Sequence, residues 1–167
     1  TGIKLSLGLM DDNGLLRRDN MRRYNLNIGI DHSITKSLKV GTNLFYTYKK
    51  FEKRNGGIFH QAYKCGPIGT LYNEDGTYNQ PPDPVFAYNQ ISPMLDEPVG
   101  AQIHDIYSNH VFGSTYINWE IIKGLTFRSN LGINVNLTRE GKFNSAVSLK
   151  HSNNESNATQ RNEEEKS

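Results

Sequence analysis

The stretch YNLNIGID, residues 24–31, alternates between apolar and polar residues along its whole length. Its apolar members are Tyr24, Leu26, Ile28 and Ile30. Successive side chains of a β-strand point to opposite sides of a sheet, so this pattern predicts a strand with an apolar face and a polar face. The apolar face could cover the core of a soluble sandwich, or it could contact lipid in a barrel whose polar face lines a lumen.

The same alternation recurs in four other segments, at residues 3–9, 38–48, 111–121 and 125–137. Several of these are as long as the roughly 9–11 residues with which a tilted strand crosses a bilayer. No segment has comparable helical periodicity. We therefore predict an all-β fold of about five antiparallel, up-and-down strands, forming a slice of a large transmembrane β-barrel.

One predicted connection is a tight hairpin between the fourth and fifth strands. Pairing Trp119 with Phe127 and Ile121 with Leu125 leaves three residues in the turn. The last of them is Gly124, a residue type that adopts the left-handed conformation such a turn requires.

The other predicted connections alternate in length. The second and third strands are joined almost as tightly, whereas a polar stretch separates the first two and a long loop, 51–104, separates the third and fourth. We expect residues 1–142 to form the partial barrel and residues 143–167 to form a polar, mobile extracellular loop, because the stretch 152–167 has almost no apolar residue. Short turns at one end and long loops at the other are typical of outer-membrane barrels, whose long loops are extracellular.

Residue types on the two faces favour lipid over a protein core. Aromatic residues of the apolar face fall near strand ends, where membrane barrels have interfacial girdles. Asn, Gly, Ser and Thr prevail on the polar face. The residues expected to face lipid are Tyr24, Leu26, Ile28, Leu44, Tyr46, Ile117, Trp119, Phe127, Leu131 and Ile133. Those expected to face the lumen are Asn25, Asn27, Asn43, Phe45, Phe112, Tyr116, Asn130 and Asn134.

Charged residues of the polar face gather near the predicted short turns. Asp31 with Lys39, and Glu120 with Arg128, would lie on neighbouring strands there. As cross-strand pairs they would pin the register, each by a few tenths of a kcal/mol.

Two other interpretations remain open. In the first, the chain is a soluble extracellular β-sandwich that binds carbohydrate through its long loop, and its apolar faces pack against each other. In the second, it is a structural slice with no activity of its own, because about five barrel strands leave two open edges.

Composition excludes several classes of protein. No run approaches the ~18 apolar residues of a membrane helix, and the hydrophobic fraction of 35% is below the roughly 45–50% of most globular proteins. The net charge of +2 is too balanced to favour nucleic acid. The chain starts at Thr1 with an apolar run already under way, so we expect it to be part of a longer protein.

No pattern of catalytic or metal-binding residues stands out. The five histidines lack metal-ligand spacing, and neither a nucleophile elbow nor a pair of catalytic carboxylates is recognisable. Cys65 is the only cysteine, without an identifiable base, so an inert thiol is expected. We therefore predict no enzyme activity, no cofactor and no metal.

Three separated segments carry a family resemblance. They read RRYNLNIGIDHSITKSLKVGTNLFYTY at 22–48, GPIGTLYNEDGTYN at 66–79 and NHVFGSTYINWEIIKGLTFRSNLGINV at 109–135. In this order they resemble the barrel region of SusC/RagA-type TonB-dependent outer-membrane transporters. The resemblance covers most of residues 1–142, including the short turn of the last segment.

The resemblance implies a much longer protein in the outer membrane of a Gram-negative bacterium. A plug would fill a barrel of about 22 strands, of which this chain is a slice. Such proteins import oligosaccharides or peptides with energy delivered through TonB, and a SusD-like lipoprotein closes over the mouth. The family's plug and TonB box have no counterpart among these residues.

The long loop contains the candidate residues for cargo binding. Aromatic rings there could stack on sugars or peptide groups, and polar side chains could donate or accept hydrogen bonds. Alternatively, the aromatics pack the loop against its own barrel and the NEDG run makes a turn. The candidate residues are Tyr63, Tyr72, Asn73, Asp75, Tyr78, Phe86 and Tyr88.

Overall fold

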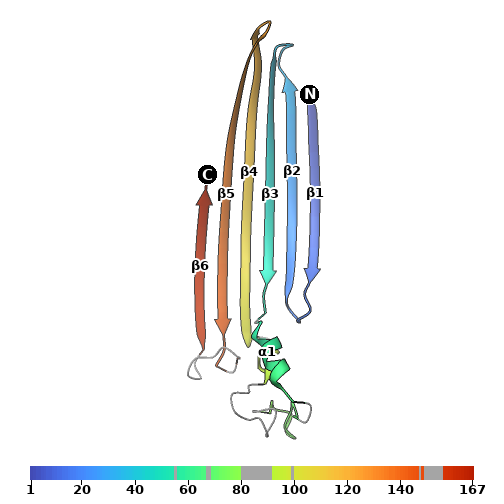
Figure 1. The fold of residues 1–167 in the computed structure, drawn as a ribbon, viewed down its shortest axis with the longest axis vertical. Helices are drawn as coiled ribbons and strands as arrows, with labels where there is room; N and C mark the ends of the chain where they lie inside the picture. The colour runs from blue at the N-terminus through green and yellow to red at the C-terminus, as the bar shows by residue number, and fades with distance from the viewer. Residues whose placement is uncertain (55, 67–68, 80–91, 99, 147, 149–155) are drawn as a thin grey trace.

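The computed structural model describes residues 1–54, 56–66, 69–79, 92–98, 100–146, 148 and 156–167. These residues form one antiparallel sheet whose strands neighbour each other in chain order (Figure 1). The strands are β1 (Gly2–Asn13), β2 (Asn20–Ser33), β3 (Leu38–Glu52), β4 (Gln102–Ile122), β5 (Leu125–Asn144) and β6 (Asn157–Lys166). The predicted all-β, up-and-down fold is confirmed.

The register joins the apolar residues of β1 to β5 into one continuous face. Leu26 lies opposite Leu7 on one side and Tyr46 on the other. Tyr46 in turn lies opposite Val111, which lies opposite Val135. A slip of one residue would turn a whole strand's apolar set to the polar face, so the alternation itself specifies this register.

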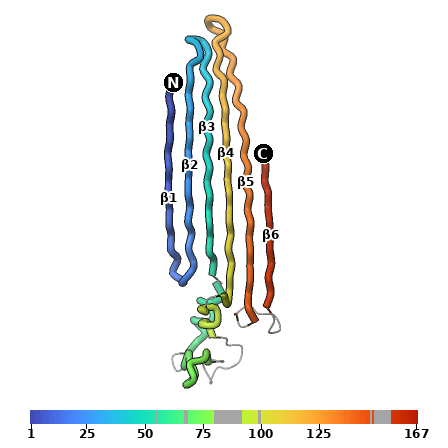
Figure 2. The backbone as a smooth tube through the Cα atoms, turned by 180° about the vertical axis from the view of Figure 1, so that it is seen from behind, coloured from blue at the N-terminus to red at the C-terminus, as the bar shows by residue number. Residues whose placement is uncertain are grey.

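The apolar face has no second layer over it within the described ranges. The strands lie side by side in a single layer, seen from both sides in Figures 1 and 2, and their main contacts are with neighbouring strands. Leu7 and Leu131 are each 76% exposed, and the buried apolar side chains among the described residues are Leu95 and Ala101. The described residues therefore do not form the sandwich that was the alternative interpretation.

A sixth strand corrects the predicted loop over 143–167. β6 pairs with the long-loop half of β5, from Asn144 opposite Asn157 to Val135 opposite Lys166. The sequence of β6 lacks apolar alternation, which is why pattern analysis missed it. Its backbone groups complete the hydrogen bonding of that half of β5, and this interaction does not depend on side-chain polarity.

The hairpin between β4 and β5 is tighter than predicted. Trp119 lies opposite Phe127, as expected, and Gly124 has a φ of 91°, the left-handed region. However, Ile122 and not Ile121 lies opposite Leu125, because the register shifts between Glu120 and Ile122. A bulge at Ile121 therefore reduces the turn to two residues.

The long connection between β3 and β4 contains a helix that periodicity did not reveal. This helix is α1 (Gly57–Lys64), and its main contacts are with a short 3-10 helix, η1 (Pro93–Asp96). The Ser92 side chain caps η1 by accepting a hydrogen bond from the Met94 amide.

In the part of the chain that the structure describes, no helix combines the length and apolar character needed to cross a membrane.

Candidate functional site

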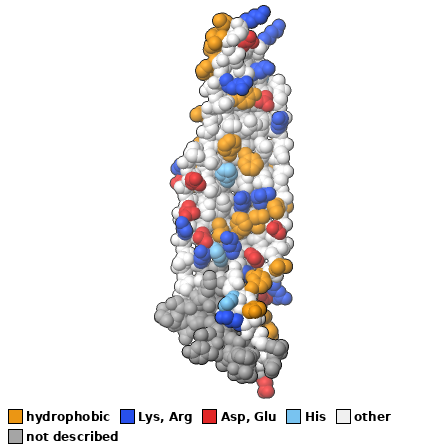
Figure 3. Space-filling view, in the orientation of Figure 1, with side chains coloured by type: hydrophobic (Ala, Val, Ile, Leu, Met, Phe, Trp, Pro, Cys, Tyr) orange, Lys and Arg blue, Asp and Glu red, His pale blue; other side chains and the backbone are white. Residues whose placement is uncertain are grey.

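The polar face of the sheet is the first candidate site. Residues that lie directly opposite one another on successive strands form rows across this face. One row consists of Asn27, Phe45, Phe112 and Asn134. In Figure 3 this face is mostly white, because neutral polar residues and glycines dominate it. The register places all eight residues that were expected to face a lumen on this one face, namely Asn25, Asn27, Asn43, Phe45, Phe112, Tyr116, Asn130 and Asn134.

Hydrogen bonds between neighbouring strands order the centre of the polar face. Thr47, only 4% exposed, donates its hydroxyl to Asn25 Oδ1 at 3.0 Å. His110 Nε2 lies 2.6 Å from Asn134 Oδ1. The imidazole also meets the Phe45 ring edge to face, with the ring centroids 6.5 Å apart. Partners on both sides therefore hold the side chains in this region.

These side chains line a shallow hollow in the polar face, with a volume of ≈ 670 Å³. Its lining includes amides from β2 and β5, such as Asn25 and Asn136. Its charged lining residues are Arg23, Lys49 and Glu165. The hollow therefore presents neutral hydrogen-bonding groups and a positive end to whatever lies over the face.

Nearer the short turns, Tyr116 crosses the polar face to reach β2. Its hydroxyl donates to Asp31 Oδ1 at 2.7 Å. The ring passes directly over Gly41, where a Cβ would lie 2.2 Å from Tyr116 Cε1. Only glycine leaves this path open.

The cross-strand charge pairs expected near the short turns are not in register. Asp31 lies opposite Gly41, and it is Ser33 that lies opposite Lys39. The second pair is offset in the same way, since Glu120 lies opposite Thr126. Hydrogen bonding to Tyr116 takes the place of the expected ion pair at Asp31.

The ten residues expected to face lipid all lie on the apolar face. Rings mark both margins of its apolar band: those of Tyr24 and Tyr48, 6.0 Å apart, toward the long loops, and Trp119 opposite Phe127 toward the short turns. The ten are Tyr24, Leu26, Ile28, Leu44, Tyr46, Ile117, Trp119, Phe127, Leu131 and Ile133.

Beyond the tyrosines, toward the long loops, the apolar face becomes charged. Arg22 lies opposite Asp11 and Lys50, and its Nε is 3.0 Å from Asp11 Oδ2. Lys50 Nζ lies 2.5 Å from Glu52 Oε1. The apolar band therefore ends at the tyrosine row, although the strands continue.

Four of the seven loop residues expected to bind cargo, Tyr72, Asn73, Asp75 and Tyr78, lie in a small hairpin. Tyr72 and Tyr78 pair through a β-bridge, and their ring centroids are 5.5 Å apart. Asn73 Nδ2 donates to Thr77 Oγ1 at 2.9 Å, so this amide is engaged within the turn. Tyr63 lies on α1 and is 89% exposed.

Asp75 also acts within this turn. The Thr77 hydroxyl and backbone amide both donate to Asp75 Oδ1, at 2.6 and 2.9 Å. These donors lower the pKa of the Asp75 carboxyl below its ordinary value, because they favour the charged form. Phe86 and Tyr88, the other two predicted cargo residues, lie outside the described residues.

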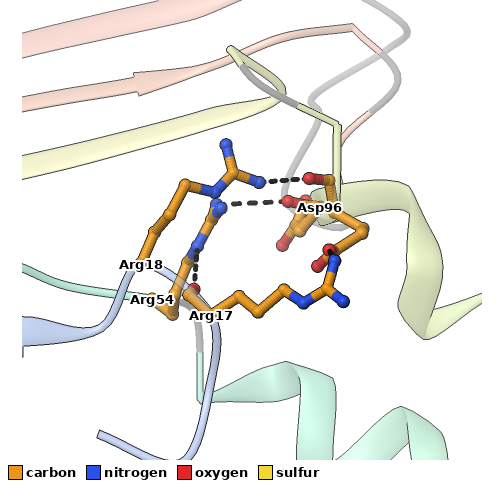
Figure 4. A network of polar contacts seen from close by, with 5 residues as sticks. Arg17, Arg18, Arg54 and Asp96 are labelled. Atoms are coloured by element: carbon orange, nitrogen blue, oxygen red, sulfur yellow. Dashed lines mark hydrogen bonds and ion pairs between the residues drawn. The ribbon is translucent and has the colours of Figure 1, made fainter. Parts of the chain in front are cut away.

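A polar network at the long-loop end was not predicted (Figure 4). Arg54, just after β3, donates to the Arg17 carbonyl at 3.0 Å and to the Asp96 carbonyl at 3.1 Å. Arg17 Nη1 also lies 2.8 Å from Glu97 Oε1, and Arg18 donates to the Glu97 carbonyl. This network ties the base of the long loop to the β1–β2 connection.

Arg17 and Arg18 lie in the stretch that separates the first two predicted strands. Most acceptors in this network are backbone carbonyl groups, which every residue type carries and which therefore leave no signal in a sequence. Burial lowers the pKa of the Arg54 guanidinium, and carboxylates near it oppose that effect. Among the residues that the structure describes, no three His, Cys, Asp or Glu side chains gather into a metal site.

No family model matches the chain. Three curated relatives from Formosa agariphila (strain DSM 15362 / KCTC 12365 / LMG 23005 / KMM 3901 / M-2Alg 35-1) do match. TonB-dependent receptor P3 is 27% identical over 78% of this chain, P39 is 27% identical over 92%, and P26 is 24% identical over 86%. Each match takes up 14% of the relative's length, so the chain spans about one seventh of these receptors. The sheet is consistent with a slice of a β-barrel, and the chain is similar to TonB-dependent receptors.

Proposed function

We propose that this chain forms part of the barrel wall of a SusC/RagA-type TonB-dependent transporter in the outer membrane of a Gram-negative bacterium. The observation that carries the proposal is a single sheet with one continuous apolar face and one polar face, and no second layer over either face within the described ranges. The similarity to TonB-dependent receptors and the resemblance of three segments to the SusC/RagA type support it.

The apolar face contacts lipid in this proposal. On β3 its apolar band covers residues 38–48, about eleven residues, which at roughly 3.4 Å per residue extend about 37 Å. Tilted by about 45°, such a strand covers the ~25 Å apolar band of an outer-membrane barrel. The tyrosine row and the pair of Trp119 and Phe127 then lie at the two membrane interfaces.

The polar face lines the lumen, where a plug belonging to the rest of the protein would pack against it. Its hydrogen-bonded centre, around Thr47, Asn25 and His110, presents polar groups that water and polar cargo can contact. The charged part of the strands beyond Tyr24 and Tyr48 stands above the membrane. Most of the polar strand β6 does so too, and its last residues, from Glu164 to Lys166, reach the tyrosine row and the row of Tyr46.

The whole protein, in this proposal, imports oligosaccharides or peptides and is not an enzyme. A SusD-like lipoprotein closes over the long-loop end, and TonB supplies energy through parts of the protein outside this chain. Within the loop, the exposed ring of Tyr63 is the described candidate freest to stack on cargo. Tyr72, Asn73, Asp75 and Tyr78 would act as a preformed hairpin. Phe86 and Tyr88 remain candidates from the sequence.

The first test measures what each face contacts in the full-length parent protein. Spin labels at Leu44→Cys and Asn43→Cys, adjacent residues on opposite faces, would be compared by electron paramagnetic resonance in lipid vesicles. We expect oxygen dissolved in lipid to relax the label at position 44 more strongly than the label at position 43. Equal oxygen accessibility, together with recovery of the parent as a detergent-independent soluble protein, would contradict the proposal.

The second test measures transport. Cells that produce the parent protein would be supplied with labelled oligosaccharides and peptides, with and without TonB and with and without the SusD-like protein. Uptake that requires TonB supports the proposal. Uptake that persists without TonB would contradict the assignment to TonB-dependent transporters. Uptake that requires TonB but not the SusD-like protein would contradict only the assignment to the SusC type.

A further inference from the structure

Two cations lie directly opposite each other on the polar face, and neither forms an ion pair with a carboxylate of the described residues. Arg23 on β2 pairs in register with Lys49 on β3, and both line the hollow described above. Directly opposite residues have Cβ atoms about 5 Å apart, and like charges placed this way destabilise a sheet. The flanking residues of the same row, Met10 and Ser108, carry no charge to relieve the repulsion.

Other cations near this end of the polar face do have carboxylate partners. Lys142 Nζ lies 2.9 Å from Glu140 Oε1, and Arg161 pairs with Glu163. In contrast, the Arg23 Nε atom is buried without a hydrogen-bond partner among the described residues. A buried donor of a charged group that lacks an acceptor is costly. Together with the like charge of Lys49 directly opposite, this favours an anion near the two side chains.

The nearest carboxylates in the sheet, Asp12 and Glu140, belong to the next row toward the loops. Glu140 is already bound by His104 Nε2 at 2.7 Å and by Lys142. Asp12 is the diagonal neighbour of Arg23, but the two side chains form no ion pair in the described sheet. Glu165 lines the same hollow on β6, three strands from Lys49 and in the row of Thr47, and is therefore about 16 Å distant along the sheet.

Neutral groups beside the two cations suit an oxyanion as well. Thr47 donates to Asn25 Oδ1, which leaves the Asn25 Nδ2 group available as a donor. The hollow of ≈ 670 Å³ is large enough for a sugar ring or an amino-acid side chain. We propose that Arg23 and Lys49 form an oxyanion site that selects cargo bearing carboxylate, sulfate or phosphate groups.

This inference rests on the proposed function, because cargo reaches the polar face only if that face lines a lumen. The first experiment uses the full-length parent protein in detergent and inorganic sulfate as the probe. The temperature at which the heat-modifiable gel band shifts would be compared for the wild type, the R23Q/K49Q double variant and K39Q. Lys39 is a matched control, since it is exposed on the same face of β3 outside the hollow.

We expect sulfate to raise the shift temperature more for the wild type and K39Q than for R23Q/K49Q at equal ionic strength. General salt effects cancel in this comparison. Without sulfate, the double variant should be no less stable than the wild type, because it loses a like-charge repulsion. If the double variant is instead destabilised without any anion, a carboxylate elsewhere in the same protein already occupies the pair, and the inference is wrong.

The second experiment measures cargo preference in cells. The probes are acidic compounds and their neutral counterparts: oligogalacturonates with their methyl esters, sulfated with desulfated galactan oligosaccharides, and glutamate with glutamine peptides. Wild type should favour acidic members by about tenfold, and R23Q/K49Q should lose that preference while K39Q keeps it. Equal uptake of both members by wild type would overturn this inference alone. Absence of TonB-dependent uptake of every pair would overturn the proposed function and this inference with it.

Discussion

The apolar and polar faces are made by the same strands, yet their side chains are organised by different interactions. On the apolar face, Leu26 lies opposite Leu7 and Tyr46, and any neighbour of similar shape and polarity would serve. On the polar face, Thr47 and Tyr116 each donate to one particular acceptor. The comparison teaches that the apolar face requires only apolar side chains of suitable size at each position. The polar face instead requires particular residues that can form particular hydrogen bonds.

The largest effect should come from placing a charge on the apolar face. Leu44→Arg, near the middle of the apolar band, should destabilise the parent protein by about 2–4 kcal/mol, because arginine is costly at the bilayer midplane. The matched variant Asn43→Arg places the same charge on the polar face and should have less than half this effect. Urea titrations in lipid vesicles measure both. Equal losses would show that the two faces do not differ in what they contact.

A smaller effect is expected on the polar face at Gly41, over which the Tyr116 ring passes closely. In Gly41→Ala the new Cβ would fall 2.2 Å from Tyr116 Cε1 and 2.5 Å from Asp31 Oδ1, so the hydrogen bond between them must break. We expect a loss of about 1–3 kcal/mol in the same titrations. As a control, Gly132→Ala meets nothing closer than a carbonyl oxygen at 3.8 Å and should be close to neutral.

Removing hydroxyl groups should change the free energy of unfolding differently on the two faces, by about 1 kcal/mol. Thr47→Val leaves Asn25 Oδ1 without its donor and should destabilise the protein by that amount. On the apolar face, Thr42 and Thr115 have hydroxyls 3.2 Å apart, and replacing both by valine removes donor and acceptor together. That double variant should be neutral or more stable. A loss as large as that of Thr47→Val would contradict the assignment of the apolar face.

The smallest effect concerns the loop hairpin, which belongs to neither face. Because the pKa of Asp75 is lowered in the folded turn, its charged form stabilises the turn above the ordinary value near 3.8. This stabilisation is lost as the pH falls through the lowered pKa. Hydrogen exchange of the Thr77 amide, corrected for intrinsic rates, should accelerate there. Asp75→Ala should exchange rapidly at every pH, and a slow variant would show that the carboxylate is not what orders the turn.

Alternation alone was enough to predict the strands that carry the apolar face. It also predicted that Trp119 lies opposite Phe127 and that Gly124 has a positive φ. The bulge at Ile121 could not be predicted, because a bulge changes which residues lie opposite each other without changing the local alternation of the sequence. The expected pair of Asp31 and Lys39 falls out of register by two residues, because the turn between β2 and β3 places Ser33 opposite Lys39.

Interactions through the backbone explain the remaining misses. β6 has no alternation of its own and forms against the free edge of β5. Arg54 is held by the carbonyls of Arg17 and Asp96, which every residue type carries. The lining of the hollow was predicted in part, since Asn25 and Phe45 were expected to face inward. That Arg23 lies opposite Lys49, with an Nε atom that has no hydrogen-bond partner among the described residues, could be seen only once the register was known.

The loop between β3 and β4 begins and ends on adjacent strands, where the Lys53 amide donates to the His104 carbonyl at 2.8 Å. Closing a flexible loop grows more costly only slowly with length, by about 0.6 kcal/mol for each doubling. Insertions and deletions in this loop therefore leave the sheet almost unaffected. During evolution, such a scaffold can exchange its long loop many times while the sheet that carries the loop is inherited unchanged.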